Sequence, residues 1–303
     1  AALFLRLCYT EIMHFVQAKG ILSAKNGMNL YRGCTHGCIY CDSRSACYHI
    51  NHSFEDIEIK ENAIELLEDA LRRKRNKCMI GTGSMTDPYM PLEEKLGMTR
   101  KAIEIVYRYG FGFTVITKSP LILRDLELLQ AINTKAKCVV QMTLTTSDDS
   151  LCKILEPNVA VTSERFTVLK TLRDAGIPTV VWLTPILPFI NDTVENLEGI
   201  LHYCIEAKVR GIICFGMGLT LRDGNREYFY KKLDAVFPGL KEKYIQHYGT
   251  RYSVMSPHNT RLMNIFHARC KENGIETNPD VIFAYLSTFD KIPGKTNVQL
   301  ELF

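Results

Sequence analysis

Three cysteines lie close together in the segment Asn29-Leu-Tyr-Arg-Gly-Cys34-Thr-His-Gly-Cys38-Ile-Tyr-Cys41-Asp-Ser-Arg44, with the spacing Cys-x3-Cys-x2-Cys. A loop punctuated by glycines allows three thiolates to converge on one metal centre. A structural zinc site normally has four protein ligands, whereas a centre that binds a reactant keeps one position open. The spacing therefore predicts an open centre, such as a [4Fe-4S] cluster with one iron free for a small molecule.

Strand-like and helix-like patterns alternate after this loop as far as about residue 218. The expected strands are 28–31, 78–80, 113–117, 138–144, 179–183 and 211–215. Helical periodicity covers 61–73, 99–109, 121–132, 163–175 and 193–206. Nearly continuous apolar strands in an alternating βα order predict a parallel sheet with helices outside it. Six units predict an α/β fold of the partial (β/α)6 TIM-like barrel type, with functional groups at the C-terminal ends of the strands.

The chain is expected to have three parts. Residues 1–12 are interpreted as an upstream leader outside the fold, and residues 13–218 as the barrel core. Residues 219–303 are polar and rich in tyrosine and arginine, with helical pieces near 225–248 and 258–273. This C-terminal extension is predicted to close the open side of the barrel and to contact the substrate. A packing role without any catalytic duty is the alternative.

Composition narrows the class of protein. The 303 residues are 46% hydrophobic and 23% charged, which is ordinary for a globular chain. The net charge of +4 permits a polyanionic partner without demanding one. The other eight cysteines are scattered without a pairing pattern, which favours a reducing, cytoplasmic location. The sequence contains no run of about 18 apolar residues, so it predicts no membrane span.

Several short motifs carry a resemblance to a known family. They are Asn29-Leu-Tyr-Arg-Gly-Cys34, Tyr40-Cys-Asp-Ser-Arg44, Thr82-Gly-Ser-Met-Thr-Asp-Pro-Tyr89, Thr117-Lys-Ser119, Arg124-Asp125, Leu155-Glu-Pro157 and the ending Gln299-Leu-Glu-Leu-Phe303. Together they resemble the radical S-adenosylmethionine (SAM) superfamily, in its spore photoproduct lyase-like branch, often labelled DNA-repair photolyase-like. The resemblance extends over nearly all of residues 13–303.

The resemblance implies an enzyme with two cofactors. Cys34, Cys38 and Cys41 would hold a [4Fe-4S] cluster, and S-adenosyl-L-methionine would chelate its fourth iron. Reduction by a donor such as flavodoxin or ferredoxin would cleave the sulfonium, and the resulting radical would abstract a hydrogen atom from the substrate. A damaged pyrimidine in DNA is the first candidate substrate. RNA, a peptide or a small metabolite are the alternatives.

Family positions also imply roles for individual residues. Tyr40 matches an aromatic residue that contacts adenine, and the turn at Gly83 matches backbone that binds the methionyl amino group. Further cofactor contacts are implied for four polar residues, Thr86, Lys118, Gln141 and Thr143. The plain alternatives are a packing tyrosine, a tight glycine turn and a solvated lysine.

Two positions depart from the lyase pattern. The lyase has a cysteine that quenches the substrate radical where this chain has Ser84, and a tyrosine after the third cluster cysteine where this chain has Asp42. Both positions, together with Tyr40, are predicted to lie at the catalytic centre. A serine O–H donates a hydrogen atom far less readily than a thiol, so these departures predict a different late step.

Three alternatives concern the metal centre and the charges. His36 would complete a zinc site with the three cysteines, and Cys47 would be a fourth ligand of a closed cluster. A structural cluster would suit a nucleic-acid-binding protein. The basic run Arg72-Arg-Lys-Arg75 is compatible with such a role, but it also suits the C-terminal end of a helix.

Overall fold

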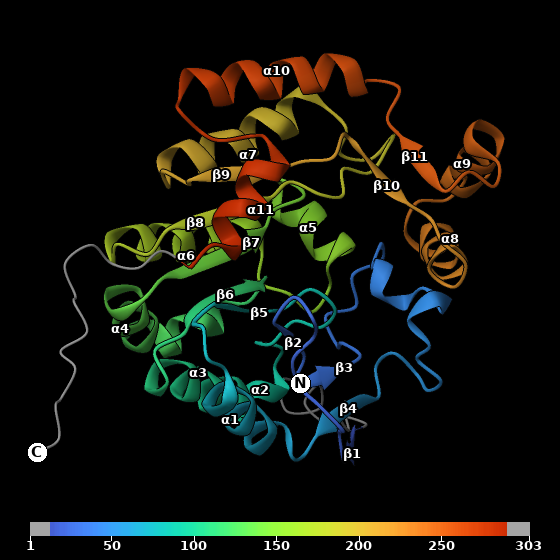
Figure 1. Ribbon diagram of the computed structural model, residues 1–303. Helices are drawn as coiled ribbons and strands as arrows, with labels where there is room; N and C mark the ends of the chain where they lie inside the picture. Colours follow the sequence, from blue (N-terminus) through green and yellow to red (C-terminus); the bar gives the residue numbers. More distant parts are fainter. Residues whose placement is uncertain (1–12, 290–303) are drawn as a thin grey trace, which may run out of the picture.

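A curved parallel sheet forms the centre of the computed structural model, which describes residues 13–289 (Figure 1). Its strand order is β2-β5-β6-β7-β8-β9, and each neighbouring pair is parallel. The strands are β2 Gly27–Met28, β5 Met79–Thr82, β6 Gly112–Thr117, β7 Cys138–Thr143, β8 Thr179–Trp182 and β9 Gly211–Ile213. Five of the six predicted strands are present, whereas the predicted strand 28–31 is divided between β2 and a strand of another sheet, Tyr31–Arg32; the open strand order confirms the partial barrel. The proposed leader 1–12 and the ending 299–303 lie outside the described residues.

Helices cover the outer face of the sheet (Figure 1). They are α1 Ala63–Arg73, α3 Met98–Arg108, α4 Leu126–Lys135, α6 Thr162–Asp174 and α7 Val194–Glu206. Their apolar positions follow the helical period: in α3, for example, Ala102, Ile103 and Val106 are fully buried. Helix α6 ends where the sequence predicts, because Gly176 adopts a left-handed φ of 72° just beyond it.

A small second sheet forms from strands between residues 13 and 60 and was not predicted as a sheet. Strand β4 (Ile57–Lys60) pairs in parallel with β1 (Met13–Val16) and antiparallel with β3 (Tyr31–Arg32). These strands contain only two to four residues, too few to give a clear period. The short helices α2 (Leu92–Leu96) and α5 (Asp149–Leu155), and the 3-10 turns η1 (Asp42–Arg44) and η2 (Ala46–Tyr48), were also missed, whereas the predicted helix 121–132 covers the 3-10 segment η3 (Pro120–Asp125) and the start of α4.

The segment after β9 combines a strand pair with four helices. Strand β10 (Gly218–Thr220) pairs antiparallel with β11 (Ser253–Met255), and the helices are α8 Asn225–Val236, α9 Leu240–Tyr248, α10 Asn259–Glu272 and α11 Pro279–Ser287. Helix α10 lies along α7 (Figure 1). Ile282 and Leu286 of α11 form one apolar cluster with side chains of β7, β8 and β9. The C-terminal segment is thus packed on the barrel, while its boundary at residue 219 remains a prediction.

No helix between residues 13 and 289 is long and apolar enough to cross a membrane.

Candidate active site

A cavity of about 570 Å³ opens at the C-terminal ends of the barrel strands. Its walls come from the cysteine loop, from the segments after β5 to β9, and from β10 and β11. Cys34, Cys38 and Cys41 all line it. The volume is that of a pocket for a cofactor-sized molecule. The cavity and the three cysteines thus lie at the C-terminal ends of the strands, where the sequence predicts the functional groups.

Backbone contacts hold the cysteine loop in place. The N–H of Cys34 donates to the carbonyl of Phe54 at 2.9 Å, and the N–H of Ile39 donates to the carbonyl of Leu155 at 3.0 Å. Gly33 adopts a φ of 87°, and a Cβ there would stand 2.6 Å from the Phe54 carbonyl oxygen. Only glycine allows this close approach. The position of Cys34 beside residues 54–56 therefore requires a glycine before it.

The spacing of the three cysteines does not suit a single zinc ion. Sulfurs around one tetrahedral zinc lie about 3.8 Å apart, given Zn–S bonds of about 2.3 Å. In the described part of the chain, only one group of three potential ligands has all its ligand atoms within 4.8 Å of one another, and it contains no cysteine. At least one pair of the three sulfurs is therefore more than 4.8 Å apart, which does not match a preformed mononuclear zinc site that includes His36.

A buried charge network lies against the cysteines. The Lys118 ammonium is 3.4 Å from Cys38 Sγ, 3.0 Å from Glu156 Oε1 and 2.9 Å from Tyr40 Oη. Glu156 also accepts hydrogen bonds from Tyr40 and from the fully buried Arg165. Burial opposes ionisation of Glu156, but the charges of Arg165 and Lys118 hold the pKa of its carboxyl well below its usual range. The network therefore keeps a cation beside the Cys38 sulfur.

Asp87 joins three of the segments that surround the cavity. Its Oδ1 accepts from the Thr117 hydroxyl at 2.7 Å, and its Oδ2 accepts from the Lys118 N–H at 2.8 Å. The Nδ1 of His36, in the cysteine loop, lies 3.6 Å from Oδ2. This carboxylate thus fixes the ends of β5 and β6 relative to the loop that carries the cysteines.

Two residues that line the cavity, Thr86 and Arg44, each have a buried polar atom without a hydrogen-bond partner, and the Thr86 hydroxyl is the candidate for contact with a ligand. Thr86 lines the cavity, and its hydroxyl is buried without a hydrogen-bond partner in the structure. A buried hydroxyl without a partner costs free energy, so its position indicates a polar group of a bound molecule. Together with the three cysteines that line the cavity, this atom shows that the residues fit a cluster and a polar cofactor beside it.

Comparisons with known proteins agree with this geometry. The sequence model of the Radical SAM superfamily matches residues 28–235. This chain belongs to the radical SAM superfamily. The uncharacterized protein Rv2578c of Mycobacterium tuberculosis is 28% identical over 229 residues, which is 73% of this chain. The uncharacterized protein MJ0683 of Methanocaldococcus jannaschii is 31% identical over 181 residues, or 59% of this chain. This chain spans 66% of the length of each relative.

A solved structure gives the same fold. Spore photoproduct lyase complexed with dinucleoside spore photoproduct superposes with a TM-score of 0.62 at 12% sequence identity, covering 88% of this chain and 81% of that chain. The resemblance to the spore photoproduct lyase-like branch is thereby confirmed at the level of the fold.

The remaining predicted residues of this radical SAM protein differ in their relation to the cavity. Gly83, Ser84 and Thr143 line it. Gln141 does not: its amide donates to the Thr114 hydroxyl and accepts from the Trp182 indole, both at 2.8 Å. Both Gln141 and Thr143 lie on β7, but Gln141 is two residues farther from the C-terminal end of the strand. There its amide forms hydrogen bonds with barrel side chains. A contact of Gln141 with the cofactor is therefore not supported by its position.

Asp42 and Cys47 lie on the rim of the site. Asp42 lines the cavity, accepts from the Tyr48 hydroxyl at 3.1 Å and lies 3.5 Å from the Arg222 guanidinium. Cys47 is exposed and absent from the cavity lining, and its thiol lies 3.3 Å from Arg222 Nη1. Its position does not support a fourth cluster ligand.

Sequence reasoning missed several residues that shape the site. They are Glu156, Arg165, Trp182, Phe215 and Arg222. The sequence contains one indication of Glu156: it precedes Pro157 in one of the motifs that carry the family resemblance. The aromatic pair Trp182 and Phe215, with ring centroids 6.3 Å apart, lines the cavity from the ends of β8 and β9.

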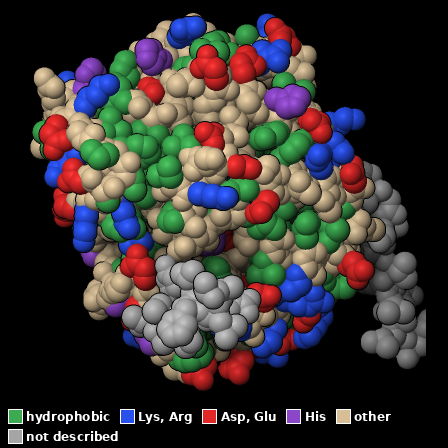
Figure 2. Space-filling view, turned by 180° about the vertical axis from the view of Figure 1, so that it is seen from behind, with side chains coloured by type: hydrophobic (Ala, Val, Ile, Leu, Met, Phe, Trp, Pro, Cys, Tyr) green, Lys and Arg blue, Asp and Glu red, His purple; other side chains and the backbone are tan. Residues whose placement is uncertain are grey.

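The predicted basic run lies at the end of α1 and is partly paired within that helix. Arg72 and Arg73 of the basic run both contact Asp69 of the same helix. Lysine, arginine and acidic side chains are interspersed over the face shown in Figure 2. The basic run is thus compatible with a solvated helix end.

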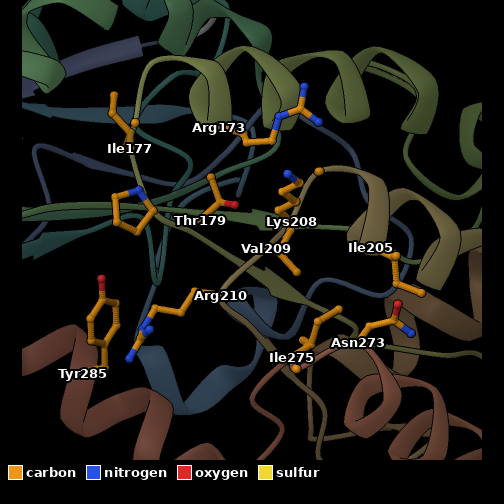
Figure 3. A pocket seen from close by; sticks show the side chains of 14 residues that line it. Arg173, Ile177, Thr179, Ile205, Lys208, Val209, Arg210, Asn273, Ile275 and Tyr285 are labelled. Atoms are coloured by element: carbon orange, nitrogen blue, oxygen red, sulfur yellow. The ribbon is translucent and has the colours of Figure 1, made fainter.

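A second cavity, of about 690 Å³, lies at the opposite end of the barrel strands (Figure 3). Arg173, Lys208, Arg210 and Tyr285 are among its lining residues, and the guanidinium of Arg210 stacks 4.0 Å over the Tyr285 ring. It contains no cysteine and no carboxylate, so it does not contribute to the cluster site.

Proposed function

We propose that this protein is a radical SAM enzyme that removes a hydrogen atom from a carbon of its substrate. One observation carries the proposal: Cys34, Cys38 and Cys41 share a cavity at the C-terminal ends of the strands with the buried, unpartnered hydroxyl of Thr86. Cys34, Cys38 and Cys41 would hold a [4Fe-4S] cluster. When bound and reduced, this cluster supplies the electron that cleaves SAM to a carbon-centred radical.

The chain's own residues would position and shield the cofactors. The Lys118 ammonium would offset the negative charge of the cluster sulfurs, because it already contacts Cys38 and stays paired with Glu156. Thr86 would donate or accept one hydrogen bond with SAM, and Thr143 and the turn at Gly83 would contact it from β7 and β5. Tyr40 would pack beside the adenine while its hydroxyl stays on Glu156.

The rim of the cavity favours a planar substrate. Phe215 is 61% exposed although it is a large apolar side chain, and it lies next to Trp182. Exposed aromatic rings of this kind are stacking surfaces for nucleobases. Arg222 lies at the rim beside Asp42 as a cation for a phosphate group. Arg44, in contrast, is paired with Glu55 and held between the rings of Phe54 and Tyr228. We therefore favour a damaged pyrimidine in DNA over RNA, a peptide or a small metabolite.

The step that quenches the substrate radical would differ from one in which a thiol donates the hydrogen atom. Ser84 and Asp42 both line the cavity, and the described lining residues include no cysteine besides the three cluster ligands. A substrate radical formed here would therefore be quenched without a thiol of the described cavity.

Anaerobic reconstitution tests the reaction type. Reconstituted protein with dithionite and SAM is expected to contain about four irons per chain and to release 5′-deoxyadenosine. Cys38→Ala should lose both properties, whereas Cys47→Ala should keep them. Protein that binds no iron would contradict the proposal. Salt-dependent DNA binding that survives Cys34→Ala, without any cleavage of SAM, would favour a binding protein instead.

Isotope transfer tests the substrate class. Reduced enzyme is incubated with an oligonucleotide that carries deuterium on a damaged dipyrimidine, and 5′-deoxyadenosine is analysed for label by mass spectrometry. Label from DNA supports the proposal, and label from matched RNA or peptide mixtures would replace it by one of those classes. Replacing dithionite with reduced flavodoxin or ferredoxin identifies a suitable electron donor.

A further inference from the structure

We infer that His14, His52 and Glu58 form a second metal site, which binds one divalent transition-metal ion of the zinc class. The site lies on the small sheet β1-β4-β3 and is independent of the proposed radical chemistry. In the described part of the chain, these three residues are the one group of three potential ligands whose ligand atoms all lie within 4.8 Å of one another.

The register of the sheet brings the ligands together. His14 on β1 pairs directly with Glu58 on β4, so both side chains lie on the same face. Asp56 precedes Glu58 by two residues and projects to this face as well. His52 comes from the loop before β4, and its ring meets the His14 ring edge to face with centroids 4.9 Å apart.

Both imidazoles are oriented as metal ligands usually are. His14 Nδ1 lies 2.9 Å from Asp56 Oδ1, and His52 Nδ1 lies 2.9 Å from the Ser53 carbonyl oxygen. A ligating histidine typically donates its other ring N–H to a carboxylate or a backbone carbonyl, which fixes the tautomer. These contacts leave Nε2 of each ring as the nitrogen for an ion.

His52 Nε2 is the strongest single indication of a ligand. This nitrogen is buried and makes no hydrogen bond. It lies 3.8 Å from Glu58 Oε2, which is too long for a hydrogen bond. Two donors on one tetrahedral zinc lie about 3.3 Å apart, so an ion between these atoms needs an inward shift of only about half an ångström.

The donor set selects the class of metal. Two imidazoles and one carboxylate, with an open position for water, suit Zn²⁺ and similar first-row ions, whereas Mg²⁺ and Ca²⁺ prefer oxygen ligands alone. The carboxylates of Glu58 and Asp56 balance the charge of a divalent ion. Arg32 is paired with Glu58 in the sheet, but its guanidinium is held by the carbonyls of Tyr48 and His49.

The proposed metal site lies next to the segment that supports the cysteine loop. Phe54, between His52 and Asp56, accepts the hydrogen bond from the Cys34 N–H. An ion held by β1, β4 and this loop would therefore brace the segment against which the cysteine loop packs.

Metal counting tests the inference. Anaerobically reconstituted protein is equilibrated with Zn²⁺ and desalted, and iron and zinc are then measured by mass spectrometry. We expect about one zinc per chain in addition to the cluster iron. His52→Gln and the isosteric Glu58→Gln should each lose the zinc while keeping the iron, and Asp56→Asn should weaken zinc binding by about 10- to 100-fold. His202→Gln, an exposed histidine on α7, is the matched control and should keep both metals.

The X-ray absorption edge of zinc separates this site from the cysteines. Nitrogen and oxygen neighbours with imidazole scattering support the inference, whereas sulfur at about 2.3 Å would place the ion on thiolates and overturn it. Zinc content near zero in the parent protein, or unchanged in both His52→Gln and Glu58→Gln, would also overturn it. Circular dichroism of each variant confirms that the fold is retained when zinc is lost.

Discussion

Glu156→Gln is expected to lower the free energy of unfolding by about 3–5 kcal/mol, because removing one charge of a buried pair leaves the other uncompensated. Glu156 and Arg165 have side chains that are 0% exposed, and that of Lys118 is 16% exposed. Glutamine keeps the volume and one acceptor oxygen, but it removes the negative charge that faces both cations. For a chain of this size the loss corresponds to a fall in Tm on the order of 10 °C.

The assay follows urea unfolding by the fluorescence of Trp182, the only tryptophan of the chain, and by circular dichroism. Glu206→Gln is the matched control, since Glu206 is 46% exposed and lies 3.6 Å from Lys170. A surface pair of this kind contributes about 0–1 kcal/mol. If Glu156→Gln stayed within about 0.5 kcal/mol of the parent, the network would not have the energetic role that its burial implies.

A double-mutant cycle then isolates the ion pair. Glu156→Gln combined with Arg165→Met should be less destabilised than the sum of the single variants, with a coupling free energy of about 0.5–3 kcal/mol. The double variant lacks the Arg165 guanidinium, which Glu156→Gln alone leaves without its carboxylate partner. Strict additivity would show that the two charges do not interact, which would refute the reasoning from their contact.

Three further outcomes are expected. Gly83→Ala should destabilise the protein by about 2 kcal/mol or more, because φ is 98° there and a Cβ would collide with the Ile116 backbone, whereas Gly20→Ala, with open space around it, should be nearly neutral in urea unfolding. Thr86→Val should weaken SAM binding by roughly 2- to 12-fold in equilibrium dialysis, the effect of one lost hydrogen bond, and an unchanged Kd would mean that its hydroxyl does not meet the cofactor. Phe215→Ala should weaken oligonucleotide binding by about 1–3 kcal/mol while the release of 5′-deoxyadenosine without substrate stays unchanged; a fall in both would place Phe215 at the cofactor instead.

Local patterns carried most of the fold prediction. The barrel strands are short apolar runs and their helices have one apolar face, so each can be recognised within about a dozen residues. The strands β1, β3 and β4 could not be found in this way, since β3 has only two residues and acquires its identity by pairing with β4. Helix α11 was not predicted from the sequence, for a related reason. Its apolar face is buried only because the inner surface of the barrel lies beneath it.

The sequence by itself determined the radical SAM family and the three cysteines, because their spacing is a property of one continuous segment. The tertiary structure alone decided how these thiols are surrounded. Lys118 and Glu156 are far from Cys38 along the chain, and they meet it only because the fold brings the end of β6, the end of α5 and the cysteine loop together. The histidine–carboxylate cluster of β1 and β4 has the same origin, since strand register, which no local pattern encodes here, places His14 beside Glu58.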